Sequence, residues 1–189
     1  RSAVPSAEVR RGAAQIVEDV RRGGDAMLEM VGRRLGGGTG RRVAASGLQE
    51  AAAALDPGLR EAIERAAANV RAVHEPQVPG PGSVEPVPGV VVERRWAPLR
   101  RVGCYVPGGR APLPSTLIMT VVPAQAAGVR SIAVSAPARD DGTVDPVVLG
   151  AAAVLGIDEV WAMGGAQAVA ALAYGTETIE PVQKIVGPG

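Results

Sequence analysis

The sequence predicts an α/β protein in which a helical N-terminal segment precedes a Rossmann-like, mostly parallel sheet. Two observations support this fold class. Apolar side chains recur at helical spacing through much of residues 9–74. From residue 102 onward, short apolar runs alternate with helical stretches, a pattern typical of parallel strands joined by right-handed crossovers. The alternation stops at Gly189 after a βαβαβα series and one further strand, so we expect a truncated half-domain.

Glycines and capping residues divide the first 74 residues into helices. Asp25 is the expected cap of the second helix, Ser46 with Gln49 forms a capping-box pattern at the third, and Asp56 precedes a proline that opens the fourth. The expected helices are residues 9–22, residues 25–35, a short helix from residue 46, and residues 57–74. Nothing in this block requires a chemical role, and helix packing explains its pattern.

A segment rich in proline and glycine follows the helices. Residues 75–89 contain five prolines and three glycines. Because proline lacks a backbone donor and restricts the residue before it, this composition indicates a linker without regular structure. We therefore divide the chain into residues 1–89, the helical segment with its linker, and residues 90–189, the sheet-forming domain.

The second part of the chain carries the strand–helix alternation. Its connections are short, which supports the assignment. A proline at the first helical position marks two of the expected helices, at Pro114 and Pro146. The expected strands are residues 90–96, 102–106, 131–135, 159–163 and 183–186, and the expected helices are residues 114–127, 146–155 and 166–174.

Two glycine pairs, Gly108-Gly109 and Gly164-Gly165, follow expected strands and precede helical stretches. Such turns bring backbone amides and helix N-termini to the carboxyl edge of a sheet, where open α/β folds bind phosphates and other ligands. The dinucleotide fingerprint G-x-G-x-x-G is missing from the sequence. Gly36, Gly38 and Gly40 come closest, but they follow a helix rather than a strand.

A few polar residues lie near these turns. Tyr105 ends its expected strand and is either a ligand contact or a plain core tyrosine. Gln167 lies among alanines and needs a partner, from a ligand or a backbone group, because an unpaired buried amide costs about 1–3 kcal/mol. Arg110 could steer a pyrophosphate or simply be solvated. Cys104 is expected to be a small core residue, and His74 to cap a helix or face solvent.

Composition excludes several classes of protein. The net charge of +1 argues against a nucleic-acid partner. With one cysteine and one histidine, neither an internal disulfide nor a zinc site built from Cys and His can form, and a reducing compartment is expected. The uncharged runs are shorter than the ~20 apolar residues of a membrane span. We expect a soluble protein without a membrane partner.

Several long motifs resemble histidinol dehydrogenase, in the order expected for that family and across nearly the whole chain. The most specific are Arg-Val-Gly-Cys-Tyr-Val-Pro-Gly-Gly at residues 101–109 and Gly-Gly-Ala-Gln-Ala at residues 164–168. Pro-Ser-Thr-Leu-Ile-Met at 114–119 and Lys-Ile-Val-Gly-Pro-Gly at 184–189 agree with them. One departure is Arg-Leu-Gly-Gly at residues 34–37, where the family usually has Arg-Phe-Asp-Gly.

The resemblance implies an NAD-dependent dehydrogenase that acts on an alcohol. That family oxidises L-histidinol, through the aldehyde, to L-histidine in histidine biosynthesis, using two NAD⁺ and a bound zinc as a cytoplasmic homodimer. By resemblance, Tyr105 and Gln167 match positions that contact NAD, and residues 90–189 form an NAD-binding domain incomplete at its C-terminus. The family's catalytic residues and zinc ligands are expected downstream of Gly189, so no catalytic or metal residue is assigned in this chain.

Two hypotheses follow. In the first, the chain is the N-terminal part of a histidinol dehydrogenase, inactive alone, that supplies the NAD-binding half for oxidation of L-histidinol or a related alcohol. In the second, the 189 residues are a catalytically silent product that acts only as a nucleotide-binding or subunit-association module.

Overall fold

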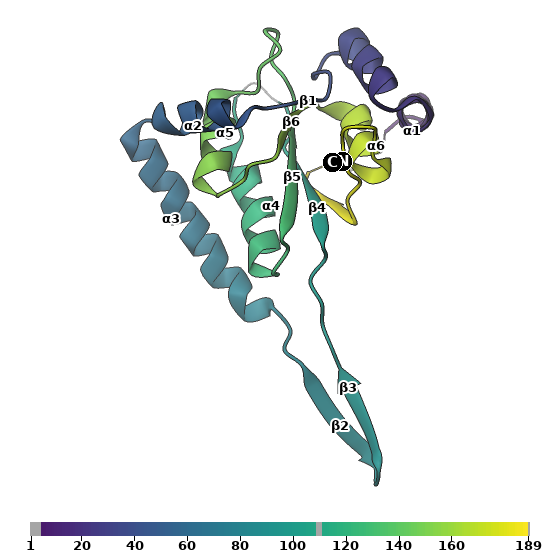
Figure 1. Cartoon of the computed structure of the whole chain (residues 1–189), viewed down its shortest axis with the longest axis vertical. Coiled ribbons are helices and arrows are strands. Elements are labelled where there is room, and N and C mark those ends of the chain that lie inside the picture. The colour runs from purple at the N-terminus through teal and green to yellow at the C-terminus, as the bar shows by residue number, and fades with distance from the viewer. Residues whose placement is uncertain (1–4, 109–110, 189) are drawn as a thin grey trace.

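A computed structural model describes residues 5–108 and 111–188 of the chain (Figure 1). Within those residues, a five-stranded sheet lies between helices, and a two-stranded hairpin projects from the body. The sheet strands are β1 (Arg41–Arg42), β4 (Arg101–Tyr105), β5 (Ser131–Ala136), β6 (Val160–Ala162) and β7 (Lys184–Val186). The hairpin is β2 (Gly82–Val87) and β3 (Val90–Arg94). The helices are α1 (Ala7–Leu35), α2 (Ala45–Ala53), α3 (Pro57–His74), α4 (Pro114–Ala126), α5 (Pro146–Val154) and α6 (Gly165–Tyr174), with a 3₁₀ turn η1 (Glu75–Gln77).

The strand order is β1-β6-β5-β4-β7. β4 pairs in parallel with β5 and β7, and β5 pairs in parallel with β6, whereas the edge strand β1 is antiparallel to β6. The series β4–β5–β6 therefore runs outward on one side of β4, and β7 lies on the other side. This arrangement confirms the predicted Rossmann-like, mostly parallel sheet and places its topological switch point between β4 and β7.

Each face of the sheet is covered by its own hydrophobic core. Helices α2 to α5 pack on one face, against alternate strand residues such as Cys104 and Val134. Helices α1 and α6 pack on the other face, against residues such as Ala133 and Trp161. Because strands of a parallel sheet are buried on both faces, they read as continuous apolar runs, which is the signal that made them predictable.

The N-terminal helices follow the prediction with two corrections. α1 is interrupted at Gly24, which has a φ of 54°, so the expected break after residue 22 is confirmed. The start of its second half is capped by a distant residue: the Asp25 N–H donates to Glu177 Oε2 at 2.7 Å. The predicted capping box at Ser46 is wrong, because α2 begins after Ala44, which makes no side-chain cap.

The predicted linker contains regular structure. Residues 75–77 form η1, and residues 82–87 form β2, which pairs antiparallel with β3. The expectation of an irregular linker is therefore wrong for this stretch. Pro86 lies where the pairing register shifts between Val84 and Val87, so its missing N–H falls at an irregularity in the ladder. The division of the chain at residue 89 stays a prediction, although the hairpin spans that position.

Candidate functional site

The strands β4 and β7 end side by side at the switch point. Tyr105 is the last residue of β4, and Gly187 follows β7 directly. A Cβ atom on Gly187 would lie 2.4 Å from the backbone oxygen of Tyr105, so only glycine allows this close approach. In open α/β sheets, ligands bind in the crevice outside the carboxyl ends of the strands at such a point. Tyr105 is therefore at the position where a ligand is expected.

The Tyr105 side chain contacts the N-terminus of α6. The Gly165 N–H donates to its hydroxyl oxygen at 3.1 Å. Gly164, the residue before the helix, has no side chain, so no side chain caps the N-terminus of α6. A phenol that accepts a hydrogen bond keeps its own hydrogen for a further acceptor. The tyrosine can thus donate to a ligand placed beside a helix end that favours anions.

Gln167 lies two residues after Gly165, in the first turn of α6, and is 4% exposed. Its Nε2 donates to the backbone oxygen of Gly36 at 3.2 Å, so a backbone group supplies the partner that the sequence required. The structure thus brings Gln167 and Tyr105 to the same corner, on the face of the sheet that α1 and α6 cover.

Residues 36–40, here called the glycine loop, cross the carboxyl ends of β5 and β6. The Gly40 N–H donates to the oxygen of Ala162 at 3.1 Å, and the oxygen of Gly37 accepts from the Ala138 N–H at 3.0 Å. Glycines 36, 37, 38 and 40 have φ values of 81°, 82°, 100° and 77°. Sequence reasoning discounted this run because it follows a helix, but its unusual density of glycine was the available signal.

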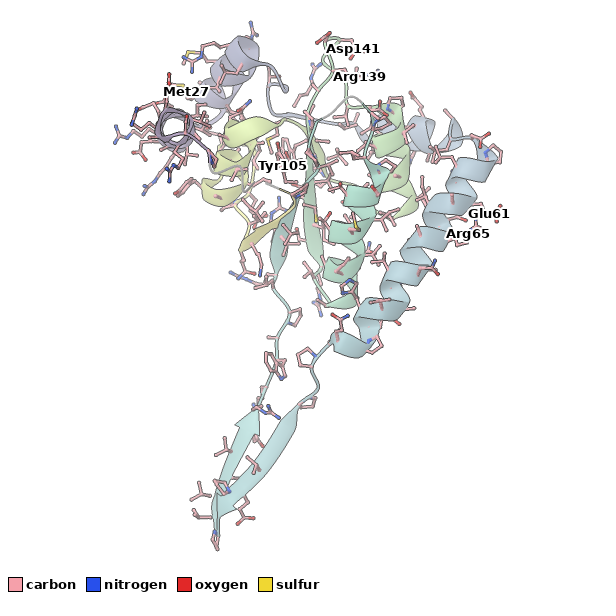
Figure 2. All side chains as sticks on the ribbon, turned by 180° about the vertical axis from the view of Figure 1, so that it is seen from behind. Met27, Glu61, Arg65, Tyr105, Arg139 and Asp141 are labelled. Atoms are coloured by element: carbon pink, nitrogen blue, oxygen red, sulfur yellow. The ribbon has the colours of Figure 1, made fainter. Side chains whose placement is uncertain are left out.

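A cavity of about 430 Å³ opens on the other side of this edge. Its walls include Gly37, Val106, Pro137 and Arg139, but neither Tyr105 nor Gln167. Figure 2 shows Arg139 and Asp141 at the outer end of the loop above the sheet, where they form an ion pair at 3.1 Å. Neither predicted ligand contact therefore lines this cavity, although Gly37 in its wall adjoins Gln167. Gly109 and Arg110, also singled out from the sequence, lie outside the described residues.

The amino end of the same strands holds a charged cluster. Arg101 donates to both carboxylate oxygens of Glu159, at 2.6 and 2.8 Å, and to Ser131 Oγ at 2.6 Å. Trp161 Nε1 donates to Glu159 at 2.7 Å. Burial alone would raise the pKa of Glu159, but the hydrogen bonds from Arg101 and Trp161, with the charge of Arg101, outweigh it and lower that pKa. The cluster is satisfied internally and is far from the candidate site.

Among the residues that the structure describes, the remaining reactive side chains do not assemble a metal site. Cys104 is fully buried, and burial raises the pKa of its thiol to about 11, so it stays neutral. His74 lines an apolar cavity of about 410 Å³ at the end of α3. Across residues 5–108 and 111–188, no group of three or more His, Cys, Asp or Glu side chains could hold a metal ion. These residues therefore do not fit a zinc ion.

The doubly wound sheet, its switch point and the glycine-lined carboxyl edge define a Rossmann-like α/β domain. Comparison with known proteins identifies the family. The family model for histidinol dehydrogenase matches residues 1–189, and the chain belongs to that family.

Individual relatives support the same family. The chain is 48% identical over 178 residues to histidinol dehydrogenase from Methanothermobacter thermautotrophicus, covering 93% of this chain and 42% of that protein. It is 48% identical over 183 residues to the enzyme from Leifsonia xyli, with 94% and 42% covered. The crystal structure of histidinol dehydrogenase from Elizabethkingia anophelis superposes with a TM-score of 0.92 at 32% identity, covering all of this chain and 44% of that one. The chain thus spans under half the length of these relatives.

No helix within the described residues is both long and apolar enough to cross a lipid bilayer.

Proposed function

We propose that this chain is the NAD-holding part of a histidinol dehydrogenase, which oxidises L-histidinol, or a related alcohol, to the amino acid in histidine biosynthesis. One observation supports the cofactor assignment above the others: the Tyr105 hydroxyl lies at the switch point, in contact with the N-terminus of α6. Family membership supports the reaction. We further propose a cytoplasmic homodimer with no nucleic-acid or membrane partner.

The contacts already made by the two predicted residues suggest how each would meet the cofactor. The Tyr105 hydroxyl accepts from Gly165, so it would donate its hydrogen to a ribose or phosphate oxygen. Gln167 donates one amide hydrogen to Gly36, which leaves its carbonyl oxygen to accept from a hydroxyl of the ligand and its second amide hydrogen to donate. Gln167 also tethers the glycine loop, and its contribution to binding is therefore partly one of positioning.

The family reaction removes four electrons from the alcohol. NAD⁺ supplies the chemistry by accepting a hydride, so two NAD⁺ are reduced and one water is consumed for each L-histidine formed. The residues of this chain would bind and orient the cofactor at the carboxyl edge. The proton-transfer groups and zinc ligands are proposed to lie in the part of the family's proteins that this chain does not span.

Calorimetric titration of NAD⁺ into the purified chain tests the cofactor site. We expect Tyr105→Ala and Gln167→Ala each to weaken binding by about tenfold, since each removes a directional hydrogen bond. Tyr174→Ala is the matched control, because this half-exposed tyrosine lies at the far end of α6. Unchanged affinity in both site variants, with circular dichroism showing folded protein, would reject the assignments.

The competing proposal is a catalytically silent module. Both proposals expect the 189-residue chain to reduce no NAD⁺ with histidinol and zinc, and measurable turnover would overturn the placement of the chemistry outside it. The encoding DNA separates them: an open reading frame that continues past Gly189 into a region with metal-ligand residues supports the enzyme, and a stop codon supports the module.

A further inference from the structure

The second half of α1, residues 25–35, is held against α6 at both of its ends (Figure 1). At its C-terminal end, the backbone oxygen of Gly36 accepts from Gln167 Nε2 in the first turn of α6. At its N-terminal end, the Asp25 N–H donates to Glu177 Oε2 at 2.7 Å. Because Glu177 follows the C-terminus of α6, the two helical segments run antiparallel and are joined at each end.

Several contacts fix the exposed Glu177 side chain at the kink of α1. A Cβ atom on Gly24, where α1 is interrupted, would lie 2.2 Å from Glu177 Oε2, so the carboxylate occupies space that glycine leaves open. The neighbouring Thr178 donates from its Oγ1 to Asp25 Oδ1 at 3.0 Å. The turn that carries both residues is anchored by Ile179, which is buried in the core between α1 and α6. The carboxylate is therefore held against the start of the helical segment.

The charge of Glu177 suits this place. The N-terminus of a helix exposes unpaired N–H groups and carries partial positive charge, so a carboxylate there is stabilising. The hydrogen bond from Asp25 holds the pKa of Glu177 below its ordinary value, so the side chain is charged at neutral pH. Glu177 thus supplies the N-terminal cap of the segment from a position 152 residues away in the chain.

The glycine loop lies directly on the same helical segment. A Cβ atom on Gly32 would lie 2.2 Å from the backbone oxygen of Gly38, and a Cβ atom on Gly40 would lie 2.3 Å from Leu28 Cδ2. The helix and the loop are therefore in close contact, with no room for a side chain between them. Because residues 25–35 form a helical rod about 16 Å long, a shift at its start also displaces the loop at its other end.

We propose that Glu177 is a positioning residue for NAD⁺ binding. By fixing the start of the helical segment, it holds the glycine loop and Gln167 in the arrangement that receives the cofactor. This role rests on the proposed NAD⁺ site. Glu177 lies beyond the opposite end of α6 from Gln167, so it acts through the helical segment and not by contact with the ligand.

Amide hydrogen exchange in the 189-residue chain without NAD⁺ tests the coupling to the loop. Glu177→Ala should speed exchange at the Gly40 N–H, which donates to Ala162, by about fivefold, because loss of the cap loosens the helix beneath the loop. Exchange at the Val134 N–H, in the central strand β5, should change by less than about twofold. An equal increase at both amides would show only a general loss of stability and would overturn the proposal, as would no increase at Gly40.

Calorimetric titration with NAD⁺ tests the link to the cofactor. Glu177→Ala should weaken binding by about threefold, and Glu177→Gln should recover most of that loss because it keeps an acceptor oxygen for Asp25. Glu29→Ala is the matched control, since it removes the same charge from an exposed site on the same helical segment, where Glu29 pairs with Arg33. This control should change the affinity by less than about 1.5-fold.

Two results of the titration would count against the role of Glu177, and they have different meanings. If Tyr105→Ala weakens NAD⁺ binding but Glu177→Ala does not, the cofactor site stands and the positioning role is overturned. If the wild-type chain binds no NAD⁺, the proposed function is rejected and this role with it, while the exchange measurement still shows whether Glu177 fixes the glycine loop.

Discussion

The two ends of the parallel strands β4, β5 and β6 are built in opposite ways. At the amino end, charged and polar side chains close the sheet: Arg101 and Ser131 begin β4 and β5, and Glu159 precedes β6. At the carboxyl end, backbone closes it, because the glycine loop lies against Ala162 and Gly187 lies against Tyr105.

The contrast separates stability from binding. In the amino-end cluster, Arg101 and Glu159 form hydrogen bonds with one another and with neighbouring groups. Their polar atoms are already partnered, so the cluster does not offer a ligand site. At the carboxyl end, the Tyr105 hydroxyl keeps a free hydrogen and the N-terminus of α6 lacks a side-chain cap. Substitutions of these side chains should therefore change mainly the free energy of unfolding at the amino end, and mainly the affinity for NAD⁺ at the carboxyl end.

The largest expected effect concerns the backbone that closes the carboxyl end, where stability depends on a close approach of the glycine loop rather than on side chains. A Cβ on Gly38 would lie 2.2 Å from the backbone oxygen of Ala162, and its φ is 100°. We expect Gly38→Ala to lower the free energy of unfolding by about 3 kcal/mol or more, measured in urea. Gly36→Ala shares the positive φ but meets no atom within 4 Å, so it should cost only about 1 kcal/mol. Equal costs would show that the close approach is unimportant.

At the amino end, Glu159→Ala should destabilise the chain by about 3 kcal/mol, because it leaves the buried guanidinium of Arg101 without its partner. Replacing both residues, as Arg101→Met with Glu159→Leu, should recover most of the loss, since no buried charge is then unpaired. Urea titration of the three variants measures the coupling. A double variant as unstable as the single one would contradict this account.

The pH dependence of the unfolding free energy tests the same ion pair between Arg101 and Glu159. Because the folded-state pKa of Glu159 is below its ordinary value of 4.5, the ion pair contributes its full stability above that pH and loses it as the pH falls through the folded-state pKa. The difference in unfolding free energy between wild type and Glu159→Gln should therefore be constant from pH 7 to about 5 and shrink below pH 4.5. A difference that persists to about pH 2 would argue against the charged pair.

The smallest expected effect lies at the binding end. Tyr105→Phe keeps the ring and removes the hydroxyl, so we expect NAD⁺ affinity to fall by about three- to tenfold with a stability change under about 1 kcal/mol. Calorimetry and urea unfolding measure the two quantities on the same protein. A loss of stability without a loss of affinity would identify Tyr105 as a structural residue.

Much of the fold was predictable because it depends on local pattern. The buried parallel strands are continuous apolar runs, and Asp56 and Asp145 cap helices α3 and α5 through their own side chains. The edge strand β1 was missed, since two arginines have no apolar periodicity. β2 was missed because prolines normally exclude a strand, and here Pro86 coincides with an irregularity in the pairing.

The candidate site was predictable only in part. The positions of Tyr105 and Gln167 followed from the strand–turn–helix pattern and from motif resemblance. Their hydrogen-bond partners, Gly165 and Gly36, lie 60 and 131 residues away in the chain, and no local rule identifies them. The same is true of the Glu177 carboxylate that caps the second half of α1.

By itself, the sequence determined the order of the helices and of strands β3 to β7, the glycine turns, and the family through its long motifs, because each is written in neighbouring residues. Only the tertiary structure decided that the glycine loop covers the carboxyl edge, which backbone group partners Gln167, and that the predicted linker is an uncovered arm. Those outcomes depend on contacts between residues distant in the chain, and their geometry is set by how the helices pack on the two faces of the sheet.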